Sequence, residues 1–193
     1  MHALEIETKF LEIDVAQICN QLNDKGAKLI YDGRITAKYY DTVQRDLKKK
    51  GASLRLRLKE ATGEIDFTYK HKKSEAVVRQ CDEIEVPVGS ADTLMGKVLF
   101  NHTDSILRNT GYEPFRCIEK NRKTFIMDNV RFELDSILKV DGVEFVIPTL
   151  LEIEAMSAEM VLNYAGLLGL KKEDSKPWST RRTIKYYRNK LEK

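Results

Sequence analysis

The chain has 193 residues, and 42% hydrophobic residues are enough for the core of one compact domain spanning residues 1–193. With 33 basic and 30 acidic residues the formal net charge is +3, so the composition does not favour general nucleic-acid binding. The three cysteines are widely spaced, the N-terminus has no signal pattern, and no apolar run approaches the roughly 18 residues of a membrane span. These features predict a cytoplasmic protein with reduced thiols, neither secreted nor inserted in a membrane.

In the first half of the chain, several segments alternate apolar and polar residues, which is typical of strands because successive side chains point to opposite faces. In chain order these segments are Leu4–Leu11, Ala27–Asp41, Leu54–Lys59, Ile65–Lys70 and Val77–Val88. Asp14 is a candidate N-cap for a helix that ends at Gly26. A turn is expected at Lys48–Gly51 and a hairpin turn at Thr62-Gly63, and Asp32-Gly33 is either a bend between two strands or part of one long strand.

The second half begins with a predicted helix that Ser90 caps and that ends before Gly111. Three further strands are predicted, over Phe115–Met127, Val130–Ile137 and Val143–Ala155, with turns at Asp128-Asn129 and Asp141-Gly142. Two helices, near Ala158–Leu168 and Thr180–Lys190, follow. Roughly eight strands in a mostly meandering order favour a closed antiparallel β-barrel with helices packed outside, so the predicted fold class is α+β.

The predicted strands carry like charges in pairs on one face. The acidic pairs are Glu5 and Glu7, Glu83 and Glu85, Glu133 and Asp135, and Glu152 and Glu154, and the basic pairs are Arg55 and Arg57, and Lys120 and Arg122. A solvated sheet face is the commonest cause of alternation, but neighbouring like charges repel unless a ligand of opposite sign is bound. Paired carboxylates suit a hard divalent cation, and paired guanidinium groups suit phosphate oxygens. We therefore expect the charged faces to line the barrel interior and the helices to cover the apolar faces.

The charged segments also resemble the motifs of a known family, in order along the chain. They are Glu5-Ile6-Glu7-Thr8-Lys9, Tyr39–Thr42, Leu54–Arg57, Thr68–Lys70, Glu83-x-Glu85, Lys120-x-Arg122, Leu134-Asp135 and Glu152-Ile153-Glu154. Together they are similar to the CYTH domain of the triphosphate tunnel metalloenzymes, which include class IV adenylyl cyclases, thiamine triphosphatases and inorganic triphosphatases. The resemblance covers nearly the whole chain and implies an eight-stranded antiparallel tunnel with external helices.

The resemblance further implies that the acidic residues hold Mg²⁺ or Mn²⁺ and that the basic residues bind a triphosphate. The implied metal ligands are Glu5, Glu7, Asp135, Glu152 and Glu154, supported by Glu83, Glu85 and Glu133. The implied substrate-binding residues are Lys9, Arg55, Arg57, Lys70, Lys120 and Arg122. From these two sets, the predicted catalytic residues are Glu5, Glu7, Lys70 and Glu154.

The predicted function is divalent-metal-dependent hydrolysis of inorganic triphosphate or an organic triphosphate. The alternative is a class IV adenylyl cyclase that makes cyclic AMP from ATP, because the two reactions bind the triphosphate alike and differ in whether water or the ribose 3′-hydroxyl attacks. A non-catalytic polyphosphate- or nucleotide-binding module is a third interpretation, in which the acidic residues would serve little purpose. The expected partner is a small-molecule triphosphate, without nucleic acid or membrane, and the oligomeric state is open between monomer and homodimer.

Two places depart from the family pattern. Ile147–Leu150 separates Gly142–Phe145 from the last acidic pair, which predicts a short insertion or bulge. The C-terminal helix offers Ser179, Thr183 and Tyr186 in place of the serine and tyrosine of many relatives, and no substrate role is assigned to it.

Overall fold

The structure is a computed structural model that describes residues 2–90 and 94–192. Its strands are β1 (His2–Phe10), β2 (Lys28–Thr42), β3 (Ala52–Lys59), β4 (Glu64–Glu75), β5 (Arg79–Ser90), β6 (Tyr112–Met127), β7 (Val130–Val140), β8 (Val143–Glu144) and β9 (Leu150–Ala155). Its helices are α1 (Val15–Asp24), α2 (Asp46–Lys49), α3 (Leu94–Asn109), α4 (Ala158–Leu167) and α5 (Thr180–Leu191), with a 3₁₀ turn over Lys172–Asp174.

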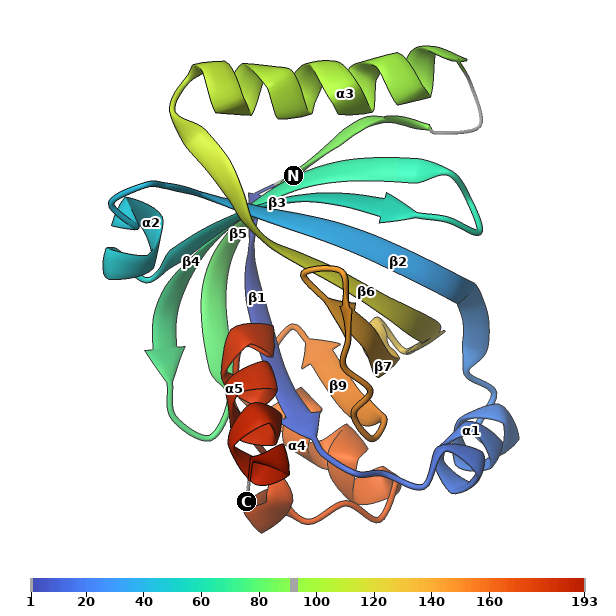
Figure 1. Ribbon diagram of the computed structural model, residues 1–193. Coiled ribbons are helices and arrows are strands. Elements are labelled where there is room, and N and C mark those ends of the chain that lie inside the picture. Colours follow the sequence, from blue (N-terminus) through green and yellow to red (C-terminus); the bar gives the residue numbers. More distant parts are fainter. Residues whose placement is uncertain (1, 91–93, 193) are drawn as a thin grey trace.

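Eight of these strands form one closed antiparallel barrel. Each strand pairs with two neighbours in the order β6-β2-β3-β4-β5-β1-β9-β7, and a further pairing of β6 with β7 closes the ring (Figure 1). The short β8 only extends β7 at its end. The predicted eight-stranded barrel with external helices is therefore confirmed.

Local sequence signals set several element boundaries as expected. The side chain of Asp14 accepts a hydrogen bond from the Gln17 amide at 3.0 Å and so caps α1. The β6–β7 hairpin turns through Asp128 and Asn129, which have φ values of 50° and 65°. This left-handed conformation suits short polar side chains and twists the turn in the sense that two paired strands require.

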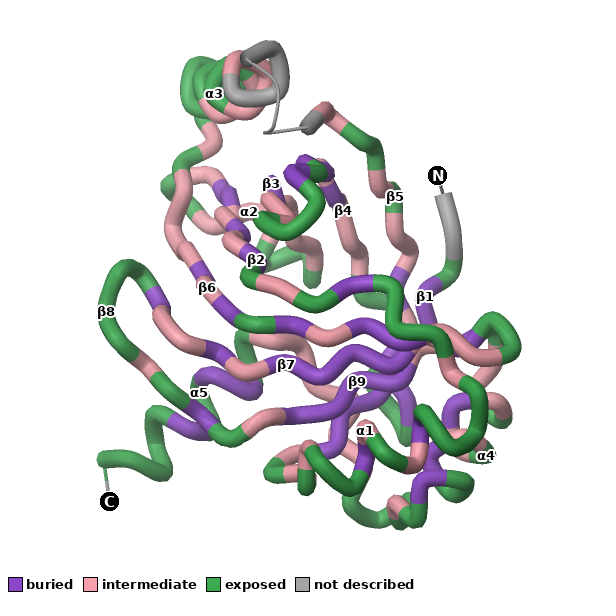
Figure 2. The backbone as a smooth tube through the Cα atoms, turned by 90° about the vertical axis from the view of Figure 1, so that its right-hand side faces the viewer, coloured by how far each residue is buried: buried purple, intermediate pink, exposed green. Residues whose placement is uncertain are grey.

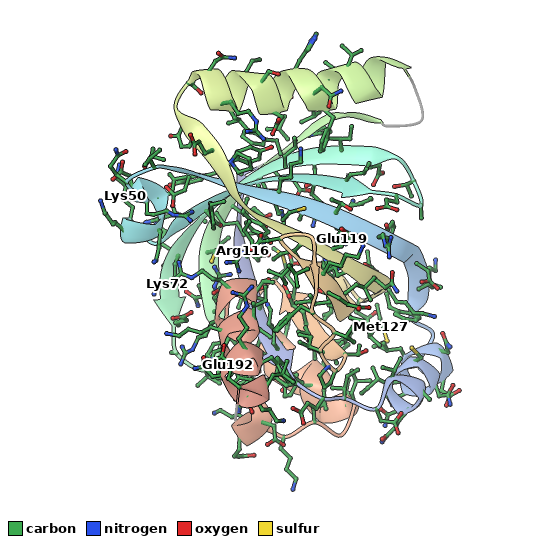
Figure 3. The ribbon with its side chains drawn as sticks, viewed as in Figure 1. Lys50, Lys72, Arg116, Glu119, Met127 and Glu192 are labelled. Carbon is green, nitrogen blue, oxygen red and sulfur yellow. The ribbon has the colours of Figure 1, made fainter. Side chains whose placement is uncertain are left out.

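Two predicted boundaries are wrong. Lys48–Gly51 is not a simple turn, because the buried Asp41 carboxylate accepts from the Leu47 and Lys48 amides and stabilises the short helix α2. Lys50 follows this helix and points outward (Figure 3). Ser90 pairs with Glu64 as the last residue of β5, and its predicted capping of a helix lies outside the described residues.

The second correction concerns the end of the barrel sheet. The predicted strand Val143–Ala155 is divided into β8 and β9, and residues 145–149 between them are not in a strand. This agrees with the predicted insertion at Ile147–Leu150. β2, by contrast, is one continuous strand through Asp32-Gly33.

The apolar core lies outside the barrel, between the strands and the helices. α1 and α4 cover β1, β7 and β9 through a cluster of fully buried side chains that includes Leu22, Phe132, Ile153 and Val161. Figure 2 shows the resulting concentration of buried residues along β7 and β9. On another side, α3 packs over Leu56 and Ile65, and the Tyr40 hydroxyl donates to Asp104 at 2.5 Å. No helix in the described part of the chain is both long enough and apolar enough to cross a bilayer.

Replacing Leu22 with alanine tests the contact between α1 and the barrel. Leu22 has no exposed surface, so Leu22→Ala should lower the free energy of unfolding by about 2–5 kcal/mol, through lost burial and the cavity left behind. Leu167→Ala, at a helical leucine that is 53% exposed, should have a far smaller effect. Equal losses in urea unfolding would contradict the described docking of α1.

Candidate functional site

The barrel interior collects the charged residues that the sequence singled out. Register places Lys9 opposite Glu152, Arg122 opposite Asp135, and Lys70 opposite Glu83. Side chains two residues apart on a strand share a face, so the remaining predicted residues also point into the interior. They are Glu5, Glu7, Arg55, Arg57, Glu85, Lys120, Glu133 and Glu154. The whole predicted set therefore points inward, as expected.

Three glutamates form an acidic cluster inside the barrel. Glu5 and Glu7 of β1 and Glu152 of β9 each place a carboxylate oxygen within 4.8 Å of the others. All three residues are buried. The Oε2 atom of Glu5 is buried without a hydrogen-bond partner. A buried carboxylate oxygen without a donor is costly, so the cluster suits a cation that supplies the missing interaction.

Basic side chains surround this acidic cluster. The Lys9 ammonium lies 2.6 Å from Glu152 and 3.4 Å from Glu7. The Lys70 ammonium donates to Glu5 and lies 3.4 Å from Glu83. Lysines thus neutralise part of the acidic cluster, but the register also sets carboxylates opposite one another, as with Glu7 and Glu154 and with Glu133 and Glu152.

Two further carboxylates, Asp135 on β7 and Asp66 on β4, are held by arginines. Arg122 donates to both oxygens of Asp135 at 2.6 Å, and Lys120 reaches the same carboxylate at 2.6 Å. Arg57 donates to both oxygens of Asp66, at 3.0 and 2.8 Å, and to Glu85 at 3.0 Å. Asp135 therefore lies with the bases, apart from the acidic cluster. Glu154, the other expected metal ligand, is the next interior residue of β9 after Glu152.

Burial and neighbouring charges shift the pKa values of the acidic residues in opposite directions. Burial would raise the pKa of Glu7, but Lys9, a hydrogen bond with Glu152 and the charge of Lys70 together outweigh it and hold this pKa at about 2. Burial likewise opposes ionisation of Asp135, yet Arg122 and Lys120 hold its pKa well below the ordinary value. Burial and the nearby Glu7 raise the pKa of Glu152. Burial, with Glu5 and Glu133 close by, raises the pKa of Glu154 to about 8.

The acidic half of the interior is thus short of positive charge. Two of its carboxyl groups, Glu152 and Glu154, hold a proton more tightly than a free glutamate does. A divalent cation would replace those protons and satisfy the free oxygen of Glu5. Hard oxygen donors of this kind suit Mg²⁺ or Mn²⁺.

Several residues on the interior face of the described strands were not among the predicted site residues. Arg79 donates to Glu7 at 2.6 Å, and Asp66 holds Arg57. Thr68 accepts from Arg55 at 3.1 Å, and Tyr39 lies opposite Arg55. Arg79 shares strand parity with Glu83, and Asp66 shares it with Lys70, so their inward direction was available from the alternating pattern. Their ion-pair partners could not be predicted from this pattern, because the partners belong to other strands.

The family model of the CYTH domain matches residues 3–164. The chain belongs to the CYTH family. A proposed adenylate cyclase of Vibrio parahaemolyticus superposes on this CYTH chain with a TM-score of 0.74 and 20% identity, covering 94% of this chain and 98% of that one. A protein of Pyrococcus horikoshii superposes with a TM-score of 0.69 and 23% identity, covering 91% of this chain and 96% of that one.

A third similar structure is a proposed adenylyl cyclase of Hippeastrum with a dominant triphosphatase activity. It superposes with a TM-score of 0.64 and 16% identity, covering 94% of the CYTH chain and 95% of its own. Identities this low establish the shared fold alone. No curated protein matches the chain significantly.

The raised pKa of Glu154 makes a prediction about stability in metal-free protein. The folded state keeps the Glu154 proton up to about pH 8, whereas the unfolded value is near 4.5. This contribution to stability is complete below about pH 4.5 and is lost as the pH rises through about 8. Glu154→Gln, which cannot ionise, should therefore lose less stability than the wild type across that window.

Chemical unfolding at several pH values, with chelator present, measures this difference. Glu144→Gln removes one carboxylate from the exposed strand β8 and serves as the control. Identical pH slopes for wild type and Glu154→Gln would show that Glu154 ionises like a solvent-exposed glutamate.

Proposed function

We propose that the protein is a divalent-metal-dependent hydrolase of a triphosphate compound. The observation that carries the proposal is the buried cluster of Glu5, Glu7 and Glu152, with its free carboxylate oxygen, enclosed among lysines and arginines. Such a combination fits a metal ion and a polyanion bound side by side. A module that only binds a polyanion would need the basic side chains and would gain nothing from buried carboxylates. The buried carboxylates therefore argue against a binding module.

In this proposal Glu5, Glu7 and Glu152 hold Mg²⁺ or Mn²⁺, with Glu154 beside them and Asp135 and Glu133 behind the basic residues. When bound, the metal supplies positive charge that offsets the charge developing on the transferred phosphoryl group and lowers the pKa of water. Lys9, Lys70, Arg55 and the remaining interior bases position the phosphates for in-line attack.

The ion pairs of the described interior supply a reason for joint binding of metal and substrate. Lys9 is held by Glu152, and Lys70 by Glu5, so neither ammonium is free for phosphate. A metal held by the acidic cluster would give these carboxylates a new partner, so the two lysines would be free to donate to phosphate oxygens. With phosphates in place of the carboxylates on the lysines, no charge would be left buried and unpaired. We therefore expect metal and triphosphate to bind cooperatively.

Cyclisation of ATP remains the second candidate, because a proposed adenylate cyclase shares the fold over nearly its whole length. Hydrolysis is preferred, since a similar structure from Hippeastrum has a dominant triphosphatase activity. Both reactions use a small-molecule substrate and need neither nucleic acid nor a membrane. The three free cysteines support a reducing, cytoplasmic location.

Product analysis tests the proposed reaction and its metal requirement. Inorganic triphosphate, ATP and thiamine triphosphate are each incubated with Mg²⁺ or Mn²⁺, and orthophosphate and cyclic AMP are both measured. We expect orthophosphate release that stops with excess chelator and returns with the metal. Cyclic AMP from ATP without phosphate release would establish the cyclase instead, and full turnover in chelator would refute the metal requirement.

Arginine replacement tests the substrate-binding face. Arg55 donates to Thr68, while its Nε is buried without an acceptor, so this guanidinium has a donor available for phosphate. Arg55→Ala should reduce kcat/KM for triphosphate by roughly tenfold to a hundredfold, the value of one or two charged hydrogen bonds. Arg55→Lys should recover only part of the loss, because an ammonium lacks the planar fork.

Arg34→Ala provides the matched control. Arg34 lies on the outer face of β2, and its side chain is 44% exposed. Wild-type kinetics for Arg55→Ala, or an equal loss in both alanine variants, would show that Arg55 does not contact the substrate.

A further inference from the structure

A buried thiol lies on the charged inner face of the barrel, and the proposed hydrolysis does not use it. Side chains two residues apart on a strand share a face, and both Arg79 and Glu83 of β5 make ion pairs inside the barrel. Cys81 lies between them in the sequence and therefore also points inward. It has no exposed surface, whereas Cys19 and Cys117 are only partly buried.

Packing alone does not account for this thiol. A buried cysteine often serves as a small apolar residue of the core. Cys81, however, belongs to none of the three apolar clusters that the described residues form. The side chains whose charges act on its sulfur are Arg79, Glu5, Glu7 and Lys70. The thiol is thus placed among ionised groups, where its sulfur is available as a ligand.

Cys81 faces a carboxylate that has an oxygen without a partner. The register of β1 and β5 sets Cys81 directly opposite Glu5. The Cβ atoms of directly opposite residues are about 4.5–5.5 Å apart. The Oε2 atom of Glu5 is buried without a hydrogen-bond partner, and Glu5 as a whole is 5% exposed. A thiol and an unpartnered carboxylate oxygen are therefore neighbours inside the barrel.

The thiol lies beside the acidic cluster and offers a different kind of ligand. In the described part of the chain, carboxylate oxygens of Glu5, Glu7 and Glu152 lie within 4.8 Å of one another, and the sulfur of Cys81 is not part of that group. Mg²⁺ and Mn²⁺ prefer such ligands, which are all oxygen. Thiolate sulfur favours Zn²⁺ and the still softer Cd²⁺. The two kinds of cation should therefore settle at different but neighbouring positions.

We infer that Cys81 and Glu5 form a second metal site, which overlaps the acidic cluster and takes a thiophilic divalent cation of the class of Zn²⁺ and Cd²⁺. As the metal–sulfur bond forms, the thiol proton passes to the buffer, so the step needs no oxidant or reductant. Glu5 supplies an oxygen ligand, and Glu7, the next inward residue of β1, can supply another. Because Glu5 belongs to both sites, the thiophilic cation excludes Mg²⁺ or Mn²⁺. That exclusion rests on the proposed function, whereas binding at Cys81 does not.

Cadmium binding to metal-free protein tests the site without turnover. A cadmium–thiolate bond has an ultraviolet charge-transfer band that Cd²⁺ on oxygen ligands lacks. We expect this band at equimolar Cd²⁺ in the wild type and in the control, a Cys19→Ser, Cys117→Ser double variant. Cys81→Ser should lose the band, and Glu5→Gln should weaken Cd²⁺ binding by at least about tenfold. Excess Mn²⁺ should weaken Cd²⁺ binding to the wild type, a comparison that does not depend on the folding of any variant.

Three spectroscopic results overturn the inference of a thiol site. They are no band in the wild type, an unchanged band in Cys81→Ser, and full Cd²⁺ affinity in Glu5→Gln. A Cd²⁺ affinity that excess Mn²⁺ leaves unchanged, in a protein that Mn²⁺ activates, overturns the overlap of the two sites. Failure to release phosphate from any triphosphate with Mg²⁺ or Mn²⁺ overturns the proposed function instead, and the cadmium band then decides the thiol site by itself.

Discussion

Closure of the barrel removes many ionised side chains from water, and the rest of the structure depends on how their charges are balanced. An isolated buried charge costs several kcal/mol, which a folded domain of ordinary stability cannot tolerate repeatedly. The antiparallel register answers this constraint by setting bases opposite acids, as in Lys9 with Glu152 and Arg122 with Asp135. The acidic cluster is the place where this balance is incomplete, and it is also where a metal fits.

The same alternation places the residues that stabilise the fold and the residues of the candidate site on opposite faces of the strands. Each strand turns most of its apolar residues outward to the helices, where Leu22 and Val161 complete the core. Its charged residues turn inward, where they need not pack against apolar groups. A barrel of about eight strands has room inside for side chains or one small ligand. The helices can therefore supply the burial that stabilises the fold while the interior keeps its ionised groups.

The two ends of the barrel differ in a way that gives the interior a direction. The acidic residues nearest one end, such as Glu154, are partly exposed, whereas the other end meets the apolar side chains of α5. A polyanion that approaches from the Glu154 end would thus meet the proposed metal site first.

The sequence alone determined the faces of the strands, because side-chain direction alternates with period two wherever a strand forms. From that pattern the inward direction of Glu5, Arg55 and Glu152 and the closed barrel could be predicted, and the resemblance of the charged motifs to the CYTH domain predicted the family. Tertiary structure alone decided the partners, since strand register and helix docking depend on contacts between residues far apart in the chain. It placed Asp135 with Arg122 instead of with the acidic cluster, and it brought Arg79 to Glu7. It also set Tyr187 against interior residues from three other elements, because an amphipathic helix shows which face it buries but not which surface it meets.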